Sequence, residues 1–259
     1  MTLAAGDPPP FESRPGRAAS PVVFVCDHAS HALPARLGDL GISEAKLRDH
    51  IGWDPGAADV FELLAARFDA PAVRSGYSRL AIDCNRDPED PTSILEESDG
   101  VAVPGNRGLD AAARAWRRDV LFEPYHAAIE DMLDGCLAPR AFVSVHSFTP
   151  QLAGGEPRPW HVGTFWNESE GLALPFMAAL AAEDGVLVGD NLPYSGRSRR
   201  GYTTRRHAEP RGIPHIGLEI RNDLIRDEAG AALWARRIGD AREAALGLGR
   251  HAERDGGQH

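Results

Sequence analysis

The chain has 259 residues and a mass of 27.9 kDa, which corresponds to one large domain or two small ones. Hydrophobic residues make up 42% and charged residues 25%, as in ordinary folded proteins, so disordered, collagen-like and coiled-coil classes are disfavoured. The net charge of −10 would repel a phosphate backbone or an anionic membrane surface, so neither nucleic acid nor a membrane is an expected partner.

The first twenty residues are rich in proline and are broken by acids and arginines, without the apolar run of a signal peptide. We interpret residues 1–20 as a disordered lead-in and residues 21–259 as a single domain, because no repeat or low-complexity linker follows. The three cysteines, Cys26, Cys84 and Cys136, have no close Cys-x-x-Cys spacing, which favours a reduced, cytoplasmic setting. No stretch approaches the roughly 20 apolar residues that cross a bilayer.

Short apolar runs rich in β-branched residues predict strands at 21–26, 80–83, 141–146, 160–166, 186–189 and 215–220. Segments with apolar residues at helical spacing alternate with these runs, at 54–68, 109–137 with an interruption near Pro124, 172–184 and 228–248. Strands that alternate with helices predict an α/β sandwich. Residues 87–108 and 189–214 show no clear period, so we expect long loops, which are often functional in compact domains.

Polar residues follow several of the predicted strands. His28 follows the first and His146 ends the third, while Asn85 and Arg86 follow the second. Ligands of open α/β sheets bind at the carboxyl ends of strands, so these side chains are candidates for one site. Two neutral imidazoles from separate strand ends suit Zn²⁺, whose catalytic sites use three protein ligands and keep a fourth position open.

A carboxylate within the last predicted strand completes this set. Glu219 lies between Leu218 and Ile220, where an unpartnered charge would be costly to bury. A catalytic site would supply a partner, since a carboxylate can take the proton of an attacking water while arginines stabilise the oxyanion. The combination indicates amide hydrolysis.

Several of these residues also have a structural interpretation. A histidine after a strand is often a hydrogen-bonded structural residue, and we place His126 and His161 in that class. Residues 83–86 could form a turn with an Asx cap. A thiol hydrolase built on Cys84 has no local Cys-His signature in its support. One loop is crowded with arginines and is either solvated or a funnel for an anionic substrate: Arg197, Arg199, Arg200, Arg205, Arg206 and Arg211.

The ordered motifs resemble the N-formylglutamate amidohydrolase family, and the resemblance covers about residues 22–224. The matching segments are Asp27-His28-Ala-Ser, Gly52-Trp-Asp54-Pro-Gly-Ala57, Ser78-Arg79, Asp83-Cys-Asn85-Arg86, Val145-His146-Ser147, Asp190-Asn191 with Pro193-Tyr194-Ser195, His207, and Gly212-Ile-Pro-His215 running into Leu218-Glu219-Ile-Arg221-Asn-Asp223-Leu224. This family is similar in turn to zinc carboxypeptidases and aspartoacylases, which implies a three-layer α/β/α sandwich with a mixed central sheet.

The resemblance implies a role for each matching residue. His28 and His146 match metal ligands, Arg79 matches an arginine that polarises the scissile carbonyl, and Glu219 matches the general base. Asn85 and Arg86 match the pair that grips a substrate carboxylate, and we expect Arg221 and Tyr194 to contribute to substrate binding.

The third metal ligand has two candidates. His31 lies three residues after His28, the spacing of carboxypeptidases, whereas Asp54 lies in the Gly-Trp-Asp-Pro-Gly-Ala motif at a predicted helix start. We prefer Asp54, although N-cap geometry alone could explain an aspartate there.

The expected activity is zinc-dependent hydrolysis of N-formyl-L-glutamate to formate and L-glutamate, with Arg86 and either Arg221 or the basic loop binding the two carboxylates. Another divalent metal is an alternative to Zn²⁺. The alternative functions are a deacylase or peptidase acting on another N-acyl acidic amino acid, and a non-catalytic ligand-binding homologue. The sequence leaves the oligomeric state, the acyl group and the pathway open.

Overall fold

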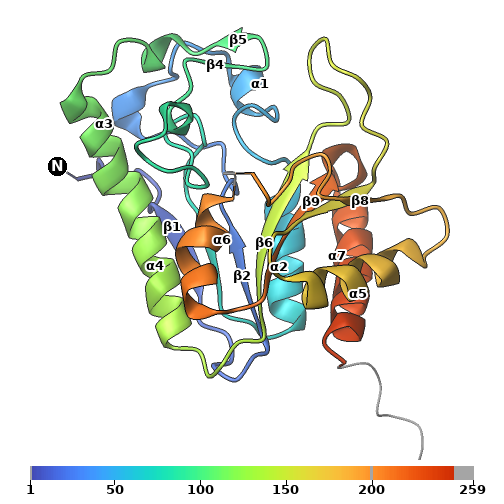
Figure 1. The fold of residues 1–259 in the computed structure, drawn as a ribbon. Coiled ribbons are helices and arrows are strands. Elements are labelled where there is room, and N and C mark those ends of the chain that lie inside the picture. The colour runs from blue at the N-terminus through green and yellow to red at the C-terminus, as the bar shows by residue number, and fades with distance from the viewer. Residues whose placement is uncertain (1, 199–200, 248–259) are drawn as a thin grey trace, which may run out of the picture.

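A mixed seven-stranded sheet organises the molecule (Figure 1). The computed structural model describes residues 2–198 and 201–247. The strands lie in the order β1 (Phe11–Arg14), β3 (Ala72–Ser75), β2 (Val22–Cys26), β6 (Ala141–Phe148), β9 (His215–Arg221), β7 (Val162–Phe165) and β8 (Val188–Asp190). The four central strands β3, β2, β6 and β9 are parallel, whereas β1 and β7 run antiparallel to their central neighbours. A separate hairpin pairs β4 (Glu97–Ser98) with β5 (Val101–Ala102).

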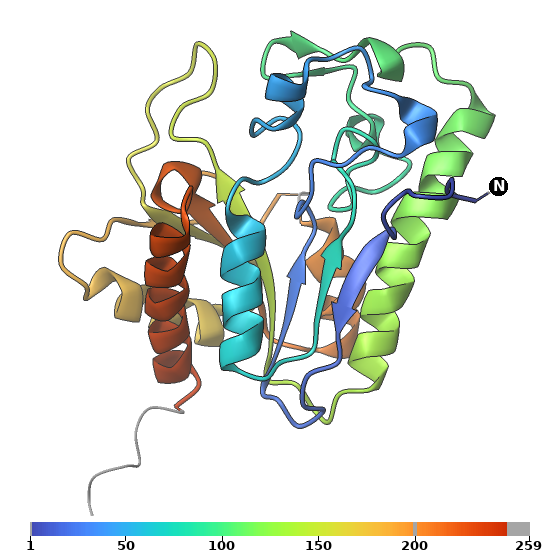
Figure 2. The ribbon, with the colours of Figure 1, turned by 180° about the vertical axis from the view of Figure 1, so that it is seen from behind.

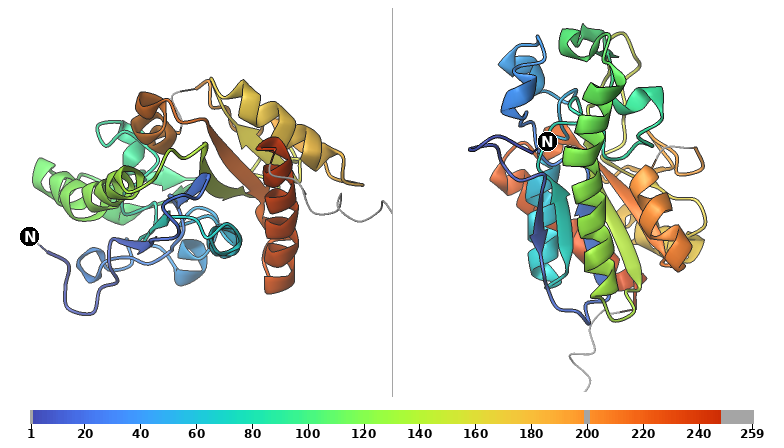
Figure 3. Two further views of the ribbon diagram at one scale, coloured as in Figure 1. Left: turned by 90° about the horizontal axis from the view of Figure 1, so that it is seen from below. Right: turned by 90° about the vertical axis from the view of Figure 1, so that its left-hand side faces the viewer.

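Helices cover both faces of this sheet. They are α1 (Glu44–Leu47), α2 (Ala57–Arg67), α3 (Ala111–Arg117), α4 (Glu123–Asp134), α5 (Glu170–Ala181), α6 (Tyr202–His207) and α7 (Glu228–Ala245). A π-helical turn, Arg118–Phe122, joins α3 to α4. Figure 2 shows α2 and α7 in front of one face, and Figure 3 shows α4 and α6 on the other side. The predicted three-layer α/β/α sandwich with a mixed sheet is therefore confirmed.

The central strands are buried on both sides, as expected for parallel strands covered by two helix layers. In β2, Val22 and Phe24 pack with α2 and α7, while Val23 and Val25 pack against α4. Apolar side chains therefore point both ways along one short strand. No helix in residues 2–198 and 201–247 is long and apolar enough to span a membrane.

The N-terminal segment differs from the prediction of a disordered lead-in. Residues Phe11–Arg14 form β1, which pairs in antiparallel register with β3. Phe11 packs partly buried against the α4 side of the core, and Glu12 bonds with Arg74 across the two strands. The prolines that suggested disorder flank this strand, at 8–10 and at Pro15. The strand lies at the edge of the sheet, where a short polar strand is tolerated.

The second predicted strand was also wrong. Residues 80–83 form an irregular loop, and the strand at this place in the sheet is β3, eight residues earlier. Leu80 and Ala81 are buried, as their apolar character requires, but side chains rather than a β-ladder bond their carbonyl oxygens. Burial and strand formation are separate properties here, because buried backbone groups can be satisfied without a sheet. The predicted long loop at 87–108 contains the β4–β5 hairpin, and the one at 189–214 contains α6.

Candidate metal centre and active site

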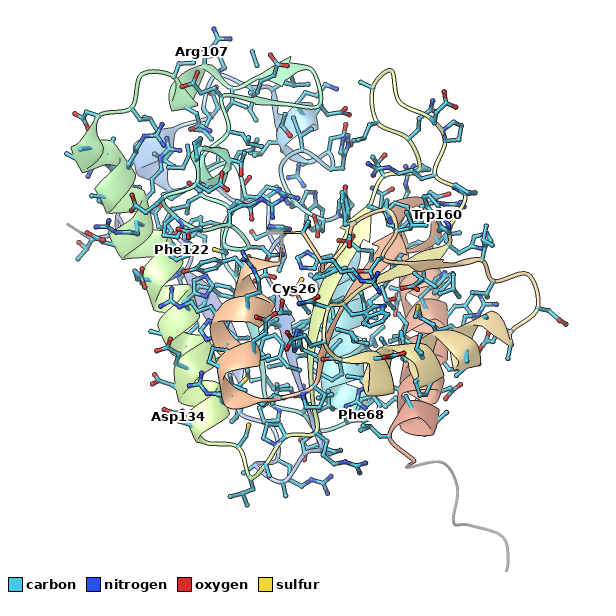
Figure 4. The ribbon with its side chains drawn as sticks, in the orientation of Figure 1. Cys26, Phe68, Arg107, Phe122, Asp134 and Trp160 are labelled. Atoms are coloured by element: carbon cyan, nitrogen blue, oxygen red, sulfur yellow. The ribbon has the colours of Figure 1, made fainter. Side chains whose placement is uncertain are left out.

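A cavity of about 250 Å³ opens at the carboxyl edge of the central strands. Cys26, the last residue of β2, lies near the centre of the molecule in Figure 4, and the site residues follow it. Eight of the nine predicted site residues line the cavity, namely His28, Asp54, Arg79, Asn85, Arg86, His146, Tyr194 and Glu219. The prediction that polar residues from separate strand ends converge is confirmed.

Three of these residues form a candidate metal-binding group. The ligand atoms of His28, Asp54 and His146 all lie within 4.8 Å of one another. Asp54 Oδ2 is 3.3 Å from His28 Nδ1 and 2.9 Å from His146 Nδ1, and all three side chains are buried. Two imidazole nitrogens and one carboxylate oxygen are a donor set that catalytic Zn²⁺ sites use. Glu219 Oε2, buried in the same cavity, has no hydrogen-bond partner among the described residues, which leaves an oxygen for a bound water. The residues present therefore fit a divalent metal ion.

Each of the two histidines presents its other ring nitrogen to a buried aspartate. His28 Nε2 lies 2.7 Å from Asp83 Oδ1, and His146 Nε2 lies 3.1 Å from Asp27 Oδ2. Carboxylates behind ligating imidazoles fix the tautomer and the ring orientation, so Nδ1 of both rings is the atom that faces Asp54. Asp27 and Asp83 are in the matched motifs, but the sequence analysis assigned them no role. The available signal was their position in the sequence, since Asp27 directly precedes His28 and Asp83 lies two residues before Asn85.

Three hydroxyl groups converge on Asp27. Tyr125 of α4 donates at 2.9 Å and Thr203 of α6 at 2.6 Å to Oδ1, while Ser144 of β6 donates at 3.0 Å to Oδ2. A buried carboxylate that accepts this many hydrogen bonds is stabilised in its charged form. The two helices on this face of the sheet therefore fix the residue that orients His146.

Asp54 does not cap α2, so N-cap geometry does not explain this aspartate. The N-cap position is Gly56, which has a φ of 79°, and a Cβ there would lie 2.2 Å from the Ile225 carbonyl oxygen. The Asp54 carboxylate instead meets His28 and His146 and accepts from the Ser147 amide at 3.3 Å.

His31 lies outside the metal-binding group. Its ring packs edge-on against Trp53, with the centroids 5.0 Å apart. Among the described residues, Asp54 rather than His31 completes the group.

Glu219 lies opposite His146 in the parallel register of β6 and β9, so both side chains point to the same face of the sheet. Only 6% of Glu219 is exposed. Burial, reinforced by the nearby Asp54 carboxylate, raises its pKa to about 7, although His146 opposes this shift. A carboxyl group that exchanges its proton near neutral pH is suited to general acid–base work.

Arg79 places a guanidinium beside the metal-binding group. It donates to Asp83 Oδ2 at 2.6 Å and approaches Asp54 Oδ1 at 3.5 Å. Both carboxylates raise its pKa against the opposing effect of burial, so the charge is permanent. The side chain remains 23% exposed and lines the cavity, where it can meet a substrate oxygen.

The expected carboxylate-binding pair lies in the same cavity. Arg86 bonds only to the Asn85 carbonyl oxygen among the described residues, at 2.9 Å. The Asn85 side chain accepts from the Thr203 amide at 3.1 Å and approaches His146. Tyr194 lines the cavity from the loop after β8 and meets Arg158 at 3.3 Å. Arg86 is thus the residue of this pair with donors available to a ligand.

Arg221 does not belong to the cavity. Its guanidinium donates to Asp223 at 2.8 Å and to the Pro159 carbonyl oxygen at 3.3 Å, and it is absent from the lining residues. Arg221 ends β9, two residues beyond Glu219, and its guanidinium is held by Asp223 in the turn that follows. The expectation that Arg221 binds substrate is therefore corrected.

The arginine-rich loop does not form a funnel within the described residues. Arg206 and Arg211 pair with Glu123 and Asp134 of α4, and Arg197 stacks over Trp166. None of these arginines lines the cavity. Arg199 and Arg200 lie outside the described residues. The described arginines of this loop are neighbours in the sequence, but their side chains point to different places. Arg206 of α6 and Arg211 of the following turn face acidic residues of α4.

The mouth of the cavity contains residues that the sequence analysis missed. His50 and Asp99 line it, with His50 Nε2 3.0 Å from Asp99 Oδ2. Asp99 also accepts from the Ala153 amide at 2.9 Å, so the β4–β5 turn, the segment before Asp54 and the loop after β6 meet at this carboxylate. The only signal in the sequence was the length of the loop at 87–108.

A buried histidine pair and a buried thiol lie outside the residues that line the cavity. His126 and His207 stack with their facing nitrogens 2.8 Å apart, and burial lowers their pKa values to about 3 and about 4. Burial also raises the pKa of the Cys84 thiol well above its ordinary value, so no reactive thiolate is available there.

The fold and the site define a class: a mixed α/β sandwich with a buried candidate metal centre at the carboxyl edge of its parallel strands. The model of the N-formylglutamate amidohydrolase family matches residues 20–226. This chain belongs to the N-formylglutamate amidohydrolase family.

Solved structures agree with this assignment. The gene product Atu2144 from Agrobacterium tumefaciens is 32% identical, with a TM-score of 0.89 over 96% of this chain and 99% of that one. N-formylglutamate amidohydrolase from Ralstonia eutropha JMP134 is 20% identical, with a TM-score of 0.71 over 92% and 98% of the two chains, and shares the fold. No curated protein matches the chain in sequence.

Proposed function

We propose that this protein is a metal-dependent amidohydrolase that cleaves an N-acyl amino acid, with N-formyl-L-glutamate, cleaved to formate and L-glutamate, as the leading substrate. The observation that carries the proposal is the convergence of His28, Asp54 and His146 in one cavity with Glu219, whose Oε2 has no hydrogen-bond partner in the described part of the chain. Membership of the amidohydrolase family supports the reaction class.

Two imidazoles and one carboxylate would hold the metal, and Zn²⁺ is the proposed ion. When bound, a divalent metal lowers the pKa of water and polarises a carbonyl group, which is the chemistry that amide hydrolysis requires. His28 and His146 would bind through Nδ1, because their Nε2 atoms are directed to Asp83 and Asp27.

Glu219 is proposed to be the general base. Its buried carboxyl group has a pKa raised to about 7, so it can accept a proton from the attacking water and deliver it to the departing amine. Arg79 is proposed to stabilise the negative charge that develops on the carbonyl oxygen, because its guanidinium is permanently charged and faces the cavity.

Arg86 is proposed to bind a substrate carboxylate, with Asn85 and Tyr194 beside it. Because Arg221 is directed away, the described part of the cavity offers one clamp arginine besides Arg79. This observation favours a second candidate, an N-acyl amino acid with a single carboxylate, which a substrate panel distinguishes from N-formyl-L-glutamate.

The test combines metal content with product release. Protein purified without an affinity tag is expected to contain one metal ion per chain and to release formate from N-formyl-L-glutamate until a chelator removes the metal. Glu219→Gln should lower kcat by about 100-fold or more while retaining the metal. Metal without formate release would refute this substrate and favour other N-acyl amino acids. A chain that binds no added Zn²⁺ would refute the enzyme and favour a ligand-binding homologue.

A further inference from the structure

Arg117, in the last turn of α3, is a buried cation without an acidic partner in residues 2–198 and 201–247. Only 1% of it is exposed. Its Nη1 donates to the Ala81 carbonyl oxygen at 2.8 Å and to Asn106 Oδ1 at 2.7 Å, and its Nη2 donates to the Gly105 carbonyl oxygen at 3.3 Å. Burial lowers its pKa to about 10, with a contribution from Arg114. Burying an unpaired charge is costly, so an apolar residue at this place would favour stability.

The segments α3, the π-helical turn and α4 follow one another as one continuous helical rod. A second side chain of this rod bonds the loop that contains Ala81. His126 Nε2, on α4, lies 3.0 Å from the Cys84 carbonyl oxygen. A carbonyl oxygen only accepts, so this nitrogen carries the proton and donates. Ala81 and Cys84 flank Asp83 on its two sides. The rod of α3, the π-helical turn and α4 therefore bonds the backbone both before and after Asp83, and Figure 4 labels Phe122 where α4 begins.

Asp83 connects this loop to the candidate metal centre. Its carboxylate lies 2.7 Å from His28 Nε2 and accepts from Arg79 at 2.6 Å and from the Asn85 amide at 2.9 Å. Residues 79–86 form no strand, so no β-ladder fixes them. A displacement of this loop would move the partner of a metal ligand, the carbonyl-polarising arginine and the clamp together.

We propose that Arg117 and His126 are positioning residues that fix the loop 79–86 against the metal centre. Asn106 supports them, because its Nδ2 donates to the carbonyl oxygens of Leu80 and Leu95 at 2.9 and 2.7 Å. The identity of the centre as a metal site rests on the proposed function. The two donors act through the backbone carbonyls, and neither is among the residues that line the cavity.

The chain contains a matched control for Arg117. Arg242, in α7, is also only 1% exposed, and none of its side-chain nitrogens has a partner among the described residues. Burial lowers its pKa to about 10 as well. Its guanidinium lies 6.0 Å from the Phe68 ring, and Figure 4 shows Phe68 toward the lower end of the molecule, away from Cys26 and the site. Arg117→Met and Arg242→Met thus remove the same group from equally buried places.

The experiment compares these two variants in two measurements. The first is the Zn²⁺ affinity of metal-free protein, measured by competition with a chromophoric chelator. The second is amide hydrogen exchange across residues 80–86, which requires neither metal nor turnover. Arg117→Met should weaken Zn²⁺ binding about tenfold, the lower end of the effect of losing an outer-shell partner, and should accelerate exchange at Asn85. Arg242→Met should change neither by more than about twofold.

Equal effects of the two variants, or no effect of Arg117→Met, would overturn the proposal. If Arg117→Met does not fold, Arg117→Lys replaces it, since an ammonium keeps the charge but cannot reproduce the forked contact with Ala81 and Gly105. The same criteria then apply to Arg117→Lys against Arg242→Lys. If the wild-type protein binds no Zn²⁺, the proposed function fails, whereas the exchange comparison still decides the positioning role.

Discussion

Glu219→Gln, which should lower kcat of the metal-loaded protein by about 100-fold or more, should stabilise the metal-free protein at alkaline pH. Burial raises the pKa of Glu219 from the ordinary 4.5 to about 7, so the native state keeps its proton where the unfolded chain has lost it. The native state is therefore penalised progressively as the pH rises from 4.5 to 7, and the penalty is constant above pH 7. A tenfold change in a protonation equilibrium is about 1.4 kcal/mol, so the full penalty is about 3 kcal/mol. Glutamine has nearly the same shape and carries no charge, which removes this penalty.

The measurement is urea unfolding of chelator-treated wild type and Glu219→Gln at pH 5 and pH 8. We expect the variant to be more stable by about 3 kcal/mol at pH 8 and by less than about 1 kcal/mol at pH 5. Glu97→Gln, an exposed change in β4, is the control and should show no such dependence. A variant that is no more stable than wild type at pH 8 would refute the argument that a buried, unpartnered carboxylate is retained there for function.

Four further predictions test other parts of the structure. Asp83→Asn should weaken Zn²⁺ binding by about 10-fold to 100-fold in a chelator competition, because His28 loses the carboxylate that orients it. Arg86→Ala should raise KM at least about tenfold in a formate-release assay, since one charged hydrogen bond is worth about 1.5–3 kcal/mol. Arg221→Ala should leave KM unchanged, because this guanidinium is bonded outside the cavity. Equal effects of the two variants would contradict the corrected position of Arg221. Gly217→Ala should lower the unfolding free energy by about 1–3 kcal/mol in urea, because its Cβ would lie 1.8 Å from the Phe165 ring. Between pH 7 and pH 5 the unfolded chain protonates His126 and His207 while their native pKa values stay near 3 and 4, so each histidine lowers stability over a range in which Glu219 raises it. Relative to wild type, His207→Gln should therefore gain about 2 kcal/mol of stability in urea between pH 7 and pH 5.

The layers of the fold and most of the polar residues that line the cavity could be predicted from the sequence. The apolar runs at β2, β6 and β9 are short and continuous, which is typical of parallel strands buried on both faces, and the intervening helical periods require a sandwich. Because the carboxyl ends of parallel strands meet at one edge, the sequence predicts that His28, His146 and Glu219 lie together.

Tertiary structure decided which side chains face the site. Arg221 and the arginines after residue 196 matched the charge that an anionic substrate needs, but local acids at Asp223, Glu123 and Asp134 pair with several of them. The sequence could not show the pairs of Arg206 and Arg211, because Glu123 and Asp134 lie 83 and 77 residues away in the chain and meet these arginines only in the fold. Asp54 rather than His31 lies in the candidate metal-binding group, because the Asp54 carboxylate before α2 is directed toward both imidazoles.

The loop at 79–86 shows the physical limit most directly. Its apolar residues correctly predicted burial, but a β-ladder was only one of the ways to satisfy their backbone groups. Arg117, Asn106 and His126, which lie more than ten residues further along the chain, provide the hydrogen bonds instead. Residue type determines which groups must be buried and which must be bonded, whereas the partners that bond them are chosen by packing between distant segments.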